Sequence, residues 1–176
     1  DEQVEVLLGN GDGTFSTLAG FAAGDGPASV VISNLDGDTK LDLAVANARS
    51  HDVSILLGNG DGTFKPAISY PLENNPVGNT FLDDADMSMA VEDFDRDGAK
   101  DLAVSDSFAQ GISVFRGDGT GSFGGVTQKA GVSNPTSMTA ADFNSDSYVD
   151  IAASEYENGV KVLAGYGAGR FRLIST

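Results

Sequence analysis

The stretch that decides the fold is DFDRDGAKDLAV, residues 93–104. Two variants of it occur elsewhere in the chain, NLDGDTKLDLAV at 34–45 and DFNSDSYVDIAA at 142–153. Each starts with acidic or amide residues at alternate positions and ends in small and branched apolar residues, a pattern typical of a tight loop that leads into a buried β-strand. Its recurrence predicts a repeat protein built from one small structural unit.

A second repeated string marks the other end of each unit. LLGNGDGTF occurs at residues 7–15 and again at 56–64, with weaker copies VFRGDGTGSF at 114–123 and VLAGYGAGRF at 162–171. Its Gly and Asn residues supply the positive φ angles of a hairpin turn. We therefore expect four short strands per unit. In the first complete unit these are Ala28–Ser33, Leu41–Ala46, Val53–Leu57 and Thr63–Ser69.

Four antiparallel strands in a repeated unit of about 49 residues are typical of a β-propeller blade. The predicted fold class is therefore all-β, with about 3.5 blades and about 14 strands in one domain over residues 1–176. The expected units are a half blade at 1–25 and complete blades at 26–72, 87–131 and 132–176, with an inserted loop at 73–86. Since a closed ring usually needs about 4–8 blades, we expect an arc that is completed by the remaining blades of a longer chain or by self-association.

Composition excludes several classes of partner. The formal net charge is −16, which argues against nucleic acid and against an anionic membrane surface, because both are bound through Lys and Arg. No apolar run approaches the roughly 20 residues of a membrane span. The chain has no Cys, so disulfides and thiolate metal sites are excluded.

The acidic loops have the residue pattern of a metal site. In DFDRDGAKD, carboxylates occupy positions 1, 3, 5 and 9, and Gly at position 6 permits a sharp turn. Alternate side chains of such a loop converge on one point, and the carbonyl oxygen of position 7 adds another ligand. Ca²⁺ takes about 6–8 oxygens in irregular geometry, whereas Mg²⁺ demands a stricter octahedron. The predicted Ca²⁺ ligands are Asp93, Asp95, Asp97, the Ala99 carbonyl and Asp101.

The other two loops repeat this scheme with one carboxylate fewer each. The first offers Asn34, Asp36, Asp38, the Lys40 carbonyl and Asp42. The third offers Asp142, Asn144, Asp146, the Tyr148 carbonyl and Asp150. Position 6 is Thr39 in the first and Ser147 in the third. We expect up to three Ca²⁺ ions, bound most tightly by the Asp93 loop because fewer charges weaken binding.

Two alternatives compete with this interpretation. An EF-hand needs Glu at position 12 and helices on both sides, but position 12 is Val45, Val104 and Ala153 and the flanks are predicted strands. The second alternative is a set of acidic turns without metal. Carboxylates that converge without a cation repel one another and raise their pKa values, so threefold recurrence favours a metal.

DFDRDGAKDLAV together with the hairpin string LLGNGDGTF is similar to the FG-GAP/VCBS repeat, the blade unit of integrin α-subunit propellers and of many secreted bacterial proteins. The resemblance covers nearly the whole chain. It implies a Ca²⁺-loaded propeller, usually of seven blades, in which the metal stiffens the hairpin between the first two strands of a blade. It also implies a role in adhesion, in recognition of proteins or glycans, or as an accessory domain of a larger enzyme. Asn34, Thr39 and Ser147 depart from the usual pattern.

We therefore expect a secreted or cell-surface module for recognition or cell adhesion that is not itself an enzyme. The alternatives are a non-catalytic accessory propeller of a polysaccharide-acting enzyme and a structural subunit of a surface or filament. Because strand direction alternates, the acidic loops and glycine turns share one end of the blades, and loops at the opposite end are freer to bind a protein or glycan. The candidate contact residues there are His51, Phe108 and Tyr156, although ordinary solvated loops are the simpler alternative.

Overall fold

The computed structural model describes residues 2–72, 86–106 and 111–175. Within these ranges the chain forms sixteen strands and no helix, so no described helix is long and apolar enough to cross a membrane. Twelve of the strands form three four-stranded sheets, called blades 1, 2 and 3. Blade 1 consists of β5 (Pro27–Ser33), β6 (Asp42–Asn47), β7 (Asp52–Leu56) and β8 (Ile68–Pro71). Blade 2 consists of β9 (Met87–Glu92), β10 (Asp101–Asp106), β11 (Gly111–Gly117) and β12 (Phe123–Ala130). Blade 3 consists of β13 (Pro135–Ala141), β14 (Asp150–Glu155), β15 (Gly159–Gly165) and β16 (Phe171–Ser175).

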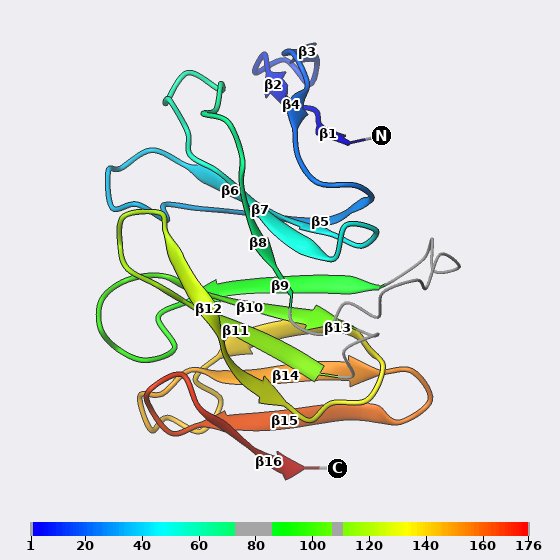
Figure 1. Ribbon diagram of the computed structural model, residues 1–176, viewed down its shortest axis with the longest axis vertical. Helices are drawn as coiled ribbons and strands as arrows, with labels where there is room; N and C mark the ends of the chain where they lie inside the picture. The colour runs from blue at the N-terminus through cyan, green and yellow to red at the C-terminus, as the bar shows by residue number, and fades with distance from the viewer. Residues whose placement is uncertain (1, 73–85, 107–110, 176) are drawn as a thin grey trace.

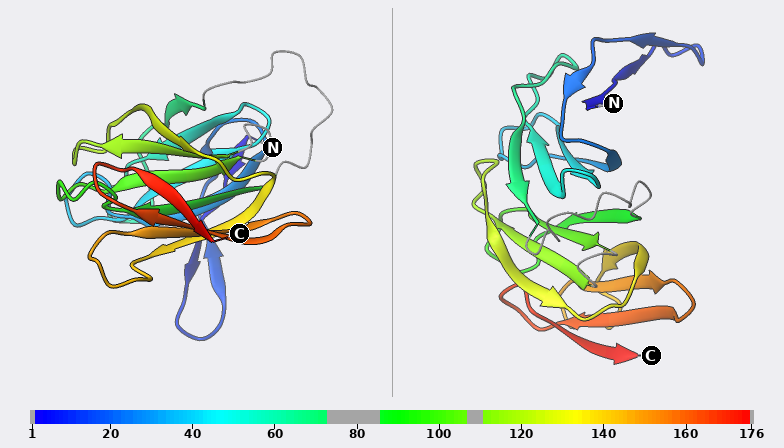
Figure 2. Two further views of the ribbon diagram at one scale, coloured as in Figure 1. Left: turned by 90° about the horizontal axis from the view of Figure 1, so that it is seen from below. Right: turned by 45° about the vertical axis from the view of Figure 1, so that its right-hand side comes forward.

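The strands of each blade are antiparallel and follow one another in chain order. Figure 1 shows the three sheets stacked one upon the next, with the N-terminal hairpin beyond blade 1 and the C-terminus beyond blade 3. The right-hand view of Figure 2 shows that the stack curves into an arc. The architecture confirms the predicted all-β fold of propeller blades.

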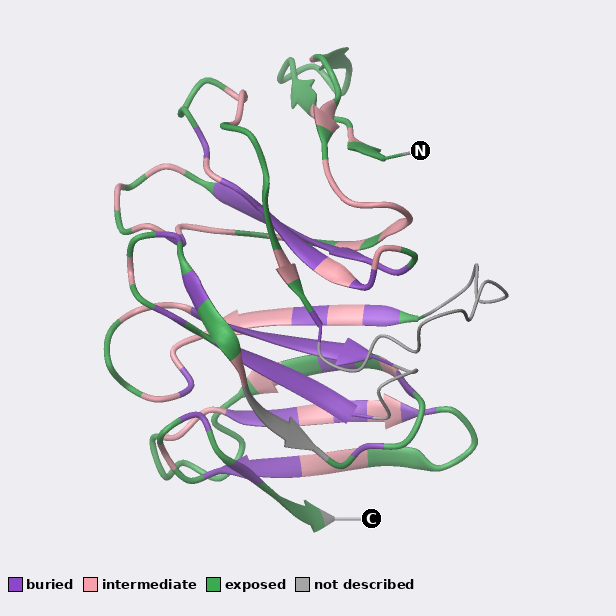
Figure 3. Cartoon of the chain, viewed as in Figure 1, coloured by how far each residue is buried: buried purple, intermediate pink, exposed green. Residues whose placement is uncertain are grey.

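The second strand of each blade explains the apolar runs of the sequence. β6 (DLAVAN) and β10 (DLAVSD) are buried at all six positions, because each lies between two strands of its own sheet and faces a neighbouring blade on at least one side. β5 instead alternates between half-buried and exposed residues, as expected for a strand with one face in solvent. In Figure 3 the buried residues concentrate in these central strands.

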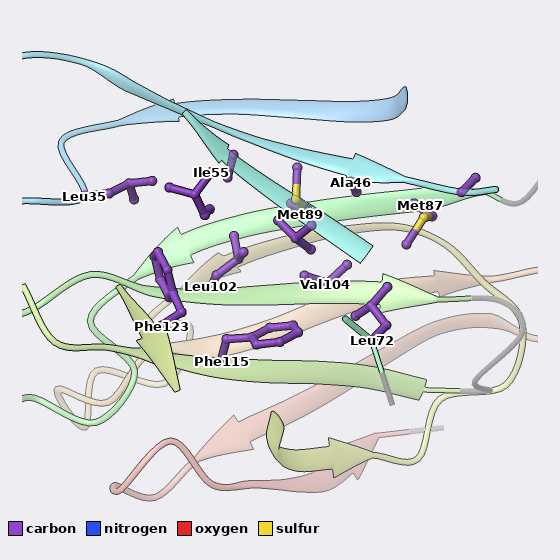
Figure 4. Close-up of a cluster of buried hydrophobic side chains, with 13 residues drawn as sticks. Leu35, Ala46, Ile55, Leu72, Met87, Met89, Leu102, Val104, Phe115 and Phe123 are labelled. Atoms are coloured by element: carbon purple, nitrogen blue, oxygen red, sulfur yellow. The ribbon is translucent and has the colours of Figure 1, made fainter. Parts of the chain in front are cut away.

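The hydrophobic core lies mainly between the blades. Figure 4 shows the cluster between blades 1 and 2, where Ile55 and Leu35 face Met89, Leu102 and Phe115. A second cluster joins blades 2 and 3. Because each sheet buries its apolar face against the next, the packing of one blade depends on the presence of its neighbour.

The fourth strand of blade 1 differs from the prediction. It begins at Ile68 rather than at Thr63. Pairing past the turn is limited to an isolated bridge between Gly58 and Phe64 and a bond from the Lys65 N–H to the Leu57 carbonyl. Pro66 follows, and its missing N–H interrupts the ladder.

The N-terminal half unit also differs from the prediction. It contains four short strands instead of two: β1 (Gln3–Val4), β2 (Leu7–Gly9), β3 (Phe15–Thr17) and β4 (Phe21–Ala22). β1 pairs with β4, and β2 pairs with β3, so together they form one interrupted hairpin. The described chain thus has sixteen strands, where about 14 were expected. The predicted insertion at 73–86 lies outside the described residues except for Asp86.

The acidic loops and the glycine turns lie at the same end of the blades, as strand direction predicts (Figure 1). They also meet across blade boundaries. Gly121, in the turn of blade 2, donates its N–H to the Leu35 carbonyl in the acidic loop of blade 1 at 3.2 Å. Gly169, in the turn of blade 3, donates likewise to the Phe94 carbonyl in the loop of blade 2 at 3.3 Å. Each acidic loop of blades 1 and 2 is therefore covered by the turn of the following blade.

Candidate metal centre

Each acidic loop connects the first two strands of a blade. In blade 2 the loop starts at Asp93, directly after β9, and its ninth residue, Asp101, is the first residue of β10. The ninth residues of the other loops, Asp42 and Asp150, likewise start β6 and β14. Strand pairing therefore fixes the ninth carboxylate, while the preceding eight residues form a short irregular loop.

The ninth-position aspartates are fully buried and have two hydrogen bonds each. In blade 2, Asp101 Oδ2 accepts the N–H of Phe94 and Oδ1 accepts the N–H of Gly117, both at 2.9 Å. The same pair of bonds recurs for Asp42 with Leu35 and Gly58, and for Asp150 with Phe143 and Gly165. These carboxylates link the loop to the end of the third strand. The sequence analysis predicted these aspartates only as metal ligands and did not predict that they link the loop to the third strand.

Three carboxylates gather in the loop of blade 2. Oxygen atoms of Asp93, Asp95 and Asp101 all lie within 4.8 Å of one another. Oxygens that share one Ca²⁺ at about 2.3–2.6 Å lie at most about 5 Å apart, so this spacing suits the ion. No other such group of three carboxylates is found in the described part of the chain. The residues of this loop thus fit the predicted metal.

The remaining predicted ligands of this loop have other contacts. Asp97 Oδ1 accepts the N–H of Ala99 at 2.8 Å, and Asp97 is not part of the three-carboxylate group. Its Oδ2 lies 3.8 Å from the guanidinium of Arg116. Asp97 is therefore adjacent to the group but is held by the loop backbone.

The electrostatics of this loop favour a cation. Burial, together with repulsion from Asp95 and Asp97, raises the pKa of Asp101 to about 6, although hydrogen bonds from Gly117 and Phe94 act in the opposite direction. A raised pKa means that the negative form is disfavoured where it stands. A divalent ion between the carboxylates would remove that penalty.

Arg116 is a contact that the sequence analysis did not identify. Its Nη2 contacts Asp95 Oδ2, and the Asp95 side chain is almost fully buried. Arg116 precedes the glycine that ends β11, and the same place holds Leu57 in blade 1 and Ala164 in blade 3. The sequence held one signal for this contact: Arg116 is basic, whereas the other complete blades have an apolar residue at the same position.

The loop of blade 1 carries its own counter-charge. Lys40 Nζ donates to Asp38 Oδ2 at 2.8 Å, and this bond is the main reason that the pKa of Asp38 is lowered. Asn34 Oδ1 accepts the N–H of Gly37 at 2.7 Å, and Asp36 Oδ1 accepts the N–H of Asp38 at 3.1 Å. An ion in this loop would have to compete with the Lys40 ammonium for Asp38.

The loop of blade 3 is more exposed. Asp142 accepts the N–H of Ser147 at 2.9 Å, and Asp146 accepts that of Tyr148 at 2.9 Å. Asn144 donates its amide to Asp146 at 3.0 Å. The guanidinium of Arg96, which belongs to the loop of blade 2, lies over the Tyr148 ring, 5.1 Å from the ring centroid. Loops 2 and 3 are therefore in contact through a cation–π pair.

The backbone of all three loops turns at the same two positions. Position 6 has positive φ in each loop: Thr39 at 80°, Gly98 at 93° and Ser147 at 72°. Position 4 is also positive: Gly37 at 76°, Arg96 at 67° and Ser145 at 62°. Thr39 and Ser147 thus adopt the turn for which glycine was expected, at the cost of strain.

The three contact candidates of the opposite end have different outcomes. His51 is only 5% exposed, and its Nε2 lies 2.9 Å from Asp106 Oδ2, so its side chain connects blades 1 and 2 beneath the surface. Tyr156 is 66% exposed and follows β14 at that end. Phe108 lies outside the described residues. Of the described candidates, Tyr156 alone offers its side chain to a ligand.

Comparison with known families supports the repeat pattern. The family model described as "FG-GAP-like repeat" matches residues 34–104 and again residues 93–153. Each match spans two successive acidic loops. The curated protein sequences contain no significant match to this chain.

Two solved structures resemble the fold. One is a lectin from Agrocybe aegerita, described as specifically recognising non-reducing terminal N-acetylglucosamine, with a TM-score of 0.63 and 20% identity. The match covers 98% of this chain and 45% of the lectin chain. The other is BBS1N in complex with ARL6DN, with a TM-score of 0.56, 15% identity, and coverage of 98% of this chain and 51% of its own. The chain thus spans about half the length of the structures it matches.

Proposed function

The chain belongs to the FG-GAP-like repeat family, and on that premise we propose that it is a calcium-binding β-propeller module that recognises a protein or glycan outside the cell. The observation that carries the calcium part is the convergence of Asp93, Asp95 and Asp101 within 4.8 Å. Extracellular modules bind Ca²⁺ at about 10⁻⁴–10⁻³ M, which suits loops of this kind.

In this proposal the metal has a structural role. Bound Ca²⁺ supplies positive charge that neutralises converging carboxylates. Asp93 and Asp95 would hold it from the irregular part of the loop and Asp101 from the start of β10. Since Asp101 also accepts the Gly117 N–H, the ion would join the loop to two strands of the sheet.

The ligand site is proposed at the opposite end of the blades. The acidic loops and glycine turns occupy one end and contact one another. In this proposal the loops around Tyr156, at the other end, hold no metal and are free to contact a ligand. The exposed Tyr156 ring can stack on a sugar or pack against a protein side chain. We assign no catalysis to the chain, because its His51–Asp106 pair lies buried between blades.

The alternative of a structural subunit, which adjoins further blades of a longer chain or of another copy, rests on one observation. Phe143 occupies the second position of the loop of blade 3, where Leu35 and Phe94 are buried in the other blades, yet it is 49% exposed. An apolar side chain exposed at a place that is covered twice elsewhere indicates a surface able to receive another blade. An accessory propeller attached to a polysaccharide-acting enzyme would use the same surface.

The calcium proposal is tested by titrating Ca²⁺ into metal-free protein in a calorimeter and by melting the protein with and without excess EGTA. We expect saturable binding, and a melting temperature several degrees lower in EGTA. Asp95→Asn should weaken the tightest site about tenfold or more, whereas Asp61→Asn, an exposed acid in a glycine turn, should not. No binding heat together with an unchanged melt would refute the proposal. A glycan array with Tyr156→Ala as control then separates a sugar ligand from a protein ligand.

A further inference from the structure

Two residues of neighbouring acidic loops are in contact across the boundary of blades 2 and 3. Arg96 is the fourth residue of the loop of blade 2, and its guanidinium lies 5.1 Å from the centre of the Tyr148 ring, the seventh residue of the loop of blade 3. The ring also borders Gly167 in the turn of its own blade, where a Cβ would meet the ring atom Cε1 at 3.2 Å. The Tyr148 ring therefore contacts both the preceding loop and the turn of its own blade.

This contact is not repeated at the boundary of blades 1 and 2. The equivalent residues there are Gly37 in the loop of blade 1 and Ala99 in the loop of blade 2, which have neither a cation nor a ring. The backbone bond from a turn to the preceding loop, in contrast, occurs at both boundaries, donated by Gly121 and by Gly169. The cation–π pair is therefore the feature that distinguishes the second boundary.

The backbone at position 4 does not explain why an arginine stands there. Arg96 has φ of 67°, close to the 76° of Gly37 and the 62° of Ser145 in the other loops. Glycine adopts this conformation without strain, whereas a long side chain does not. What arginine adds at this position is a guanidinium that reaches Tyr148.

Both partners of the pair are bonded to a carboxylate of their own loop. The N–H of Arg96 donates to Asp93 Oδ1 at 2.6 Å, and the N–H of Tyr148 donates to Asp146 Oδ1 at 2.9 Å. Each carboxylate is a predicted Ca²⁺ ligand, and so is the carbonyl of Tyr148. A continuous chain of contacts thus joins the predicted ligands of one loop to those of the next.

The loops of blades 2 and 3 also share one set of internal hydrogen bonds. In both, the first residue accepts the N–H groups of the fifth and sixth, the third accepts that of the fifth, and the fifth accepts that of the seventh. In the loop of blade 1 the first residue, Asn34, instead accepts the N–H of Gly37, and Lys40 binds Asp38. The loops of blades 2 and 3 therefore form a matched pair that the loop of blade 1 does not join.

We propose that Arg96 and Tyr148 are positioning residues that couple Ca²⁺ binding in these two loops, so that an ion in one loop raises the affinity of the other. The inference rests on the proposed function, in which the loops bind Ca²⁺. An ion held by Asp93 restrains the backbone at Arg96, whose guanidinium in turn restrains Tyr148 and its carbonyl. Because part of the second site is then already ordered, the second ion binds with a smaller loss of conformational entropy.

The size and sign of the coupling follow from the contact. A cation–π pair at the surface supports a change in affinity of about twofold to fivefold, and the change is the same in both directions. Repulsion between two ions acts against the coupling, but salt at about 0.15 M screens it beyond about 8 Å. The experiment is therefore done at that ionic strength.

The test is a Ca²⁺ titration of the whole chain, followed by NMR at the amide signals of Gly98, Ser147 and Thr39, which occupy position 6 of the three loops. Arg96→Ser should raise the Ca²⁺ midpoint reported by Ser147 about twofold to fivefold, since the link to the loop of blade 3 is lost. Tyr148→Ala should raise the midpoint reported by Gly98 by the same factor. Thr39 should report no change in either variant.

Both variants install a residue that the chain itself has at the same loop position, Ser145 and Ala99 respectively, and both keep every backbone ligand. In the Tyr148→Ala background, Arg96→Ser should no longer affect the Ser147 midpoint, because the partner is already absent. Arg172→Ser is the matched control. It removes the same charge from the exposed position of β16 and should leave all three midpoints as in the parent.

The outcomes separate this proposal from the function on which it rests. If Ca²⁺ shifts all of the signals but Arg96→Ser leaves the Ser147 midpoint unchanged, the coupling is wrong and the calcium proposal stands. The same holds if Gly98 responds to Ca²⁺ and Ser147 does not, or if Arg172→Ser has an effect equal to that of Arg96→Ser. Absence of any Ca²⁺-dependent shift overturns both proposals.

Discussion

The ring of Phe171 in blade 3 packs edge-on against the ring of Phe94 in the acidic loop of blade 2, with centroids 5.5 Å apart and planes at 76°. The carbonyl oxygen of Phe94 also accepts a hydrogen bond from the N–H of Gly169. One residue of the candidate metal loop thus joins two blades through its side chain and its backbone. Phe143, at the same loop position in blade 3, is half exposed, and no described blade follows blade 3 to cover it.

This pair gives a first prediction about stability. Phe94→Ala should lower the free energy of unfolding by about 3–5 kcal/mol, because it removes a buried aromatic contact and leaves a cavity. Phe143→Ala, at the same loop position, should change it by less than about 1 kcal/mol. Urea denaturation of both variants measures the difference. Similar losses in the two variants would mean that Phe143 is covered in solution.

Arg116 gives a second prediction, about metal affinity. Its guanidinium contacts Asp95 and competes with any cation bound there. Arg116→Leu, which installs the residue of blade 1, should therefore strengthen Ca²⁺ binding about threefold to tenfold. Arg172→Leu removes the same charge from an exposed strand and serves as control in the same calorimetric titration. Equal effects of the two variants would attribute the change to net charge rather than to this contact.

The blades were predictable because their signals are local. The run DLAVSD is buried at every position in β10, and its apolar content alone predicted a strand. Likewise the alternate carboxylates of residues 93–101 and the glycines of the turns indicated the loop and hairpin directly. Each of these features depends on neighbours within about ten residues along the chain.

Contacts between strands and blades could not be predicted in the same way. That Arg116 contacts Asp95 depends on the register of β11 beside β10, with Leu102 opposite Phe115. The burial of His51 depends on Asp106, which belongs to the next blade. Hydrophobic pattern does not specify either pairing, so the sequence predicted His51 only as a candidate ligand contact in a loop.

A third prediction concerns backbone strain at loop position 6. Gly98 has φ of 93°, and a Cβ there meets nothing within 4 Å. Gly98→Thr should therefore destabilise the chain by about 1–2 kcal/mol through conformation alone. Thr39→Gly, the reverse exchange in blade 1, should stabilise by at most about 1 kcal/mol, because glycine also gains freedom in the unfolded chain. Urea denaturation checks both. The explanation by strain fails if Gly98→Thr is neutral.

A fourth prediction concerns an exposed turn. The Thr63 hydroxyl donates to Asp61 at 2.6 Å and its N–H at 2.9 Å, and these bonds lower the pKa of Asp61 below its ordinary value. A lowered pKa stabilises the fold above the unfolded value of 3.8, and this contribution is lost as pH falls through the folded value. Thr63→Val should raise the pKa of Asp61 in an NMR titration. Asp118, which has the same bonds to Thr120, is the internal control and should not move.

The last prediction compares equivalent carboxylates in two loops. Asp38 in blade 1 is already bound by Lys40 at 2.8 Å, whereas Asp97 in blade 2 lies 3.8 Å from its nearest cation, Arg116, and repels the carboxylate of Asp101. Since an ion gains less from a carboxylate that it must first take from an ammonium group, Asp97→Ala should weaken calcium binding more than Asp38→Ala does. The amide signals of Gly98 and Thr39, followed during Ca²⁺ titration by NMR, report the two loops separately. Lys40→Ala should strengthen binding in blade 1 alone. If Asp38→Ala is the more damaging variant, the Lys40 ammonium does not compete with calcium in solution.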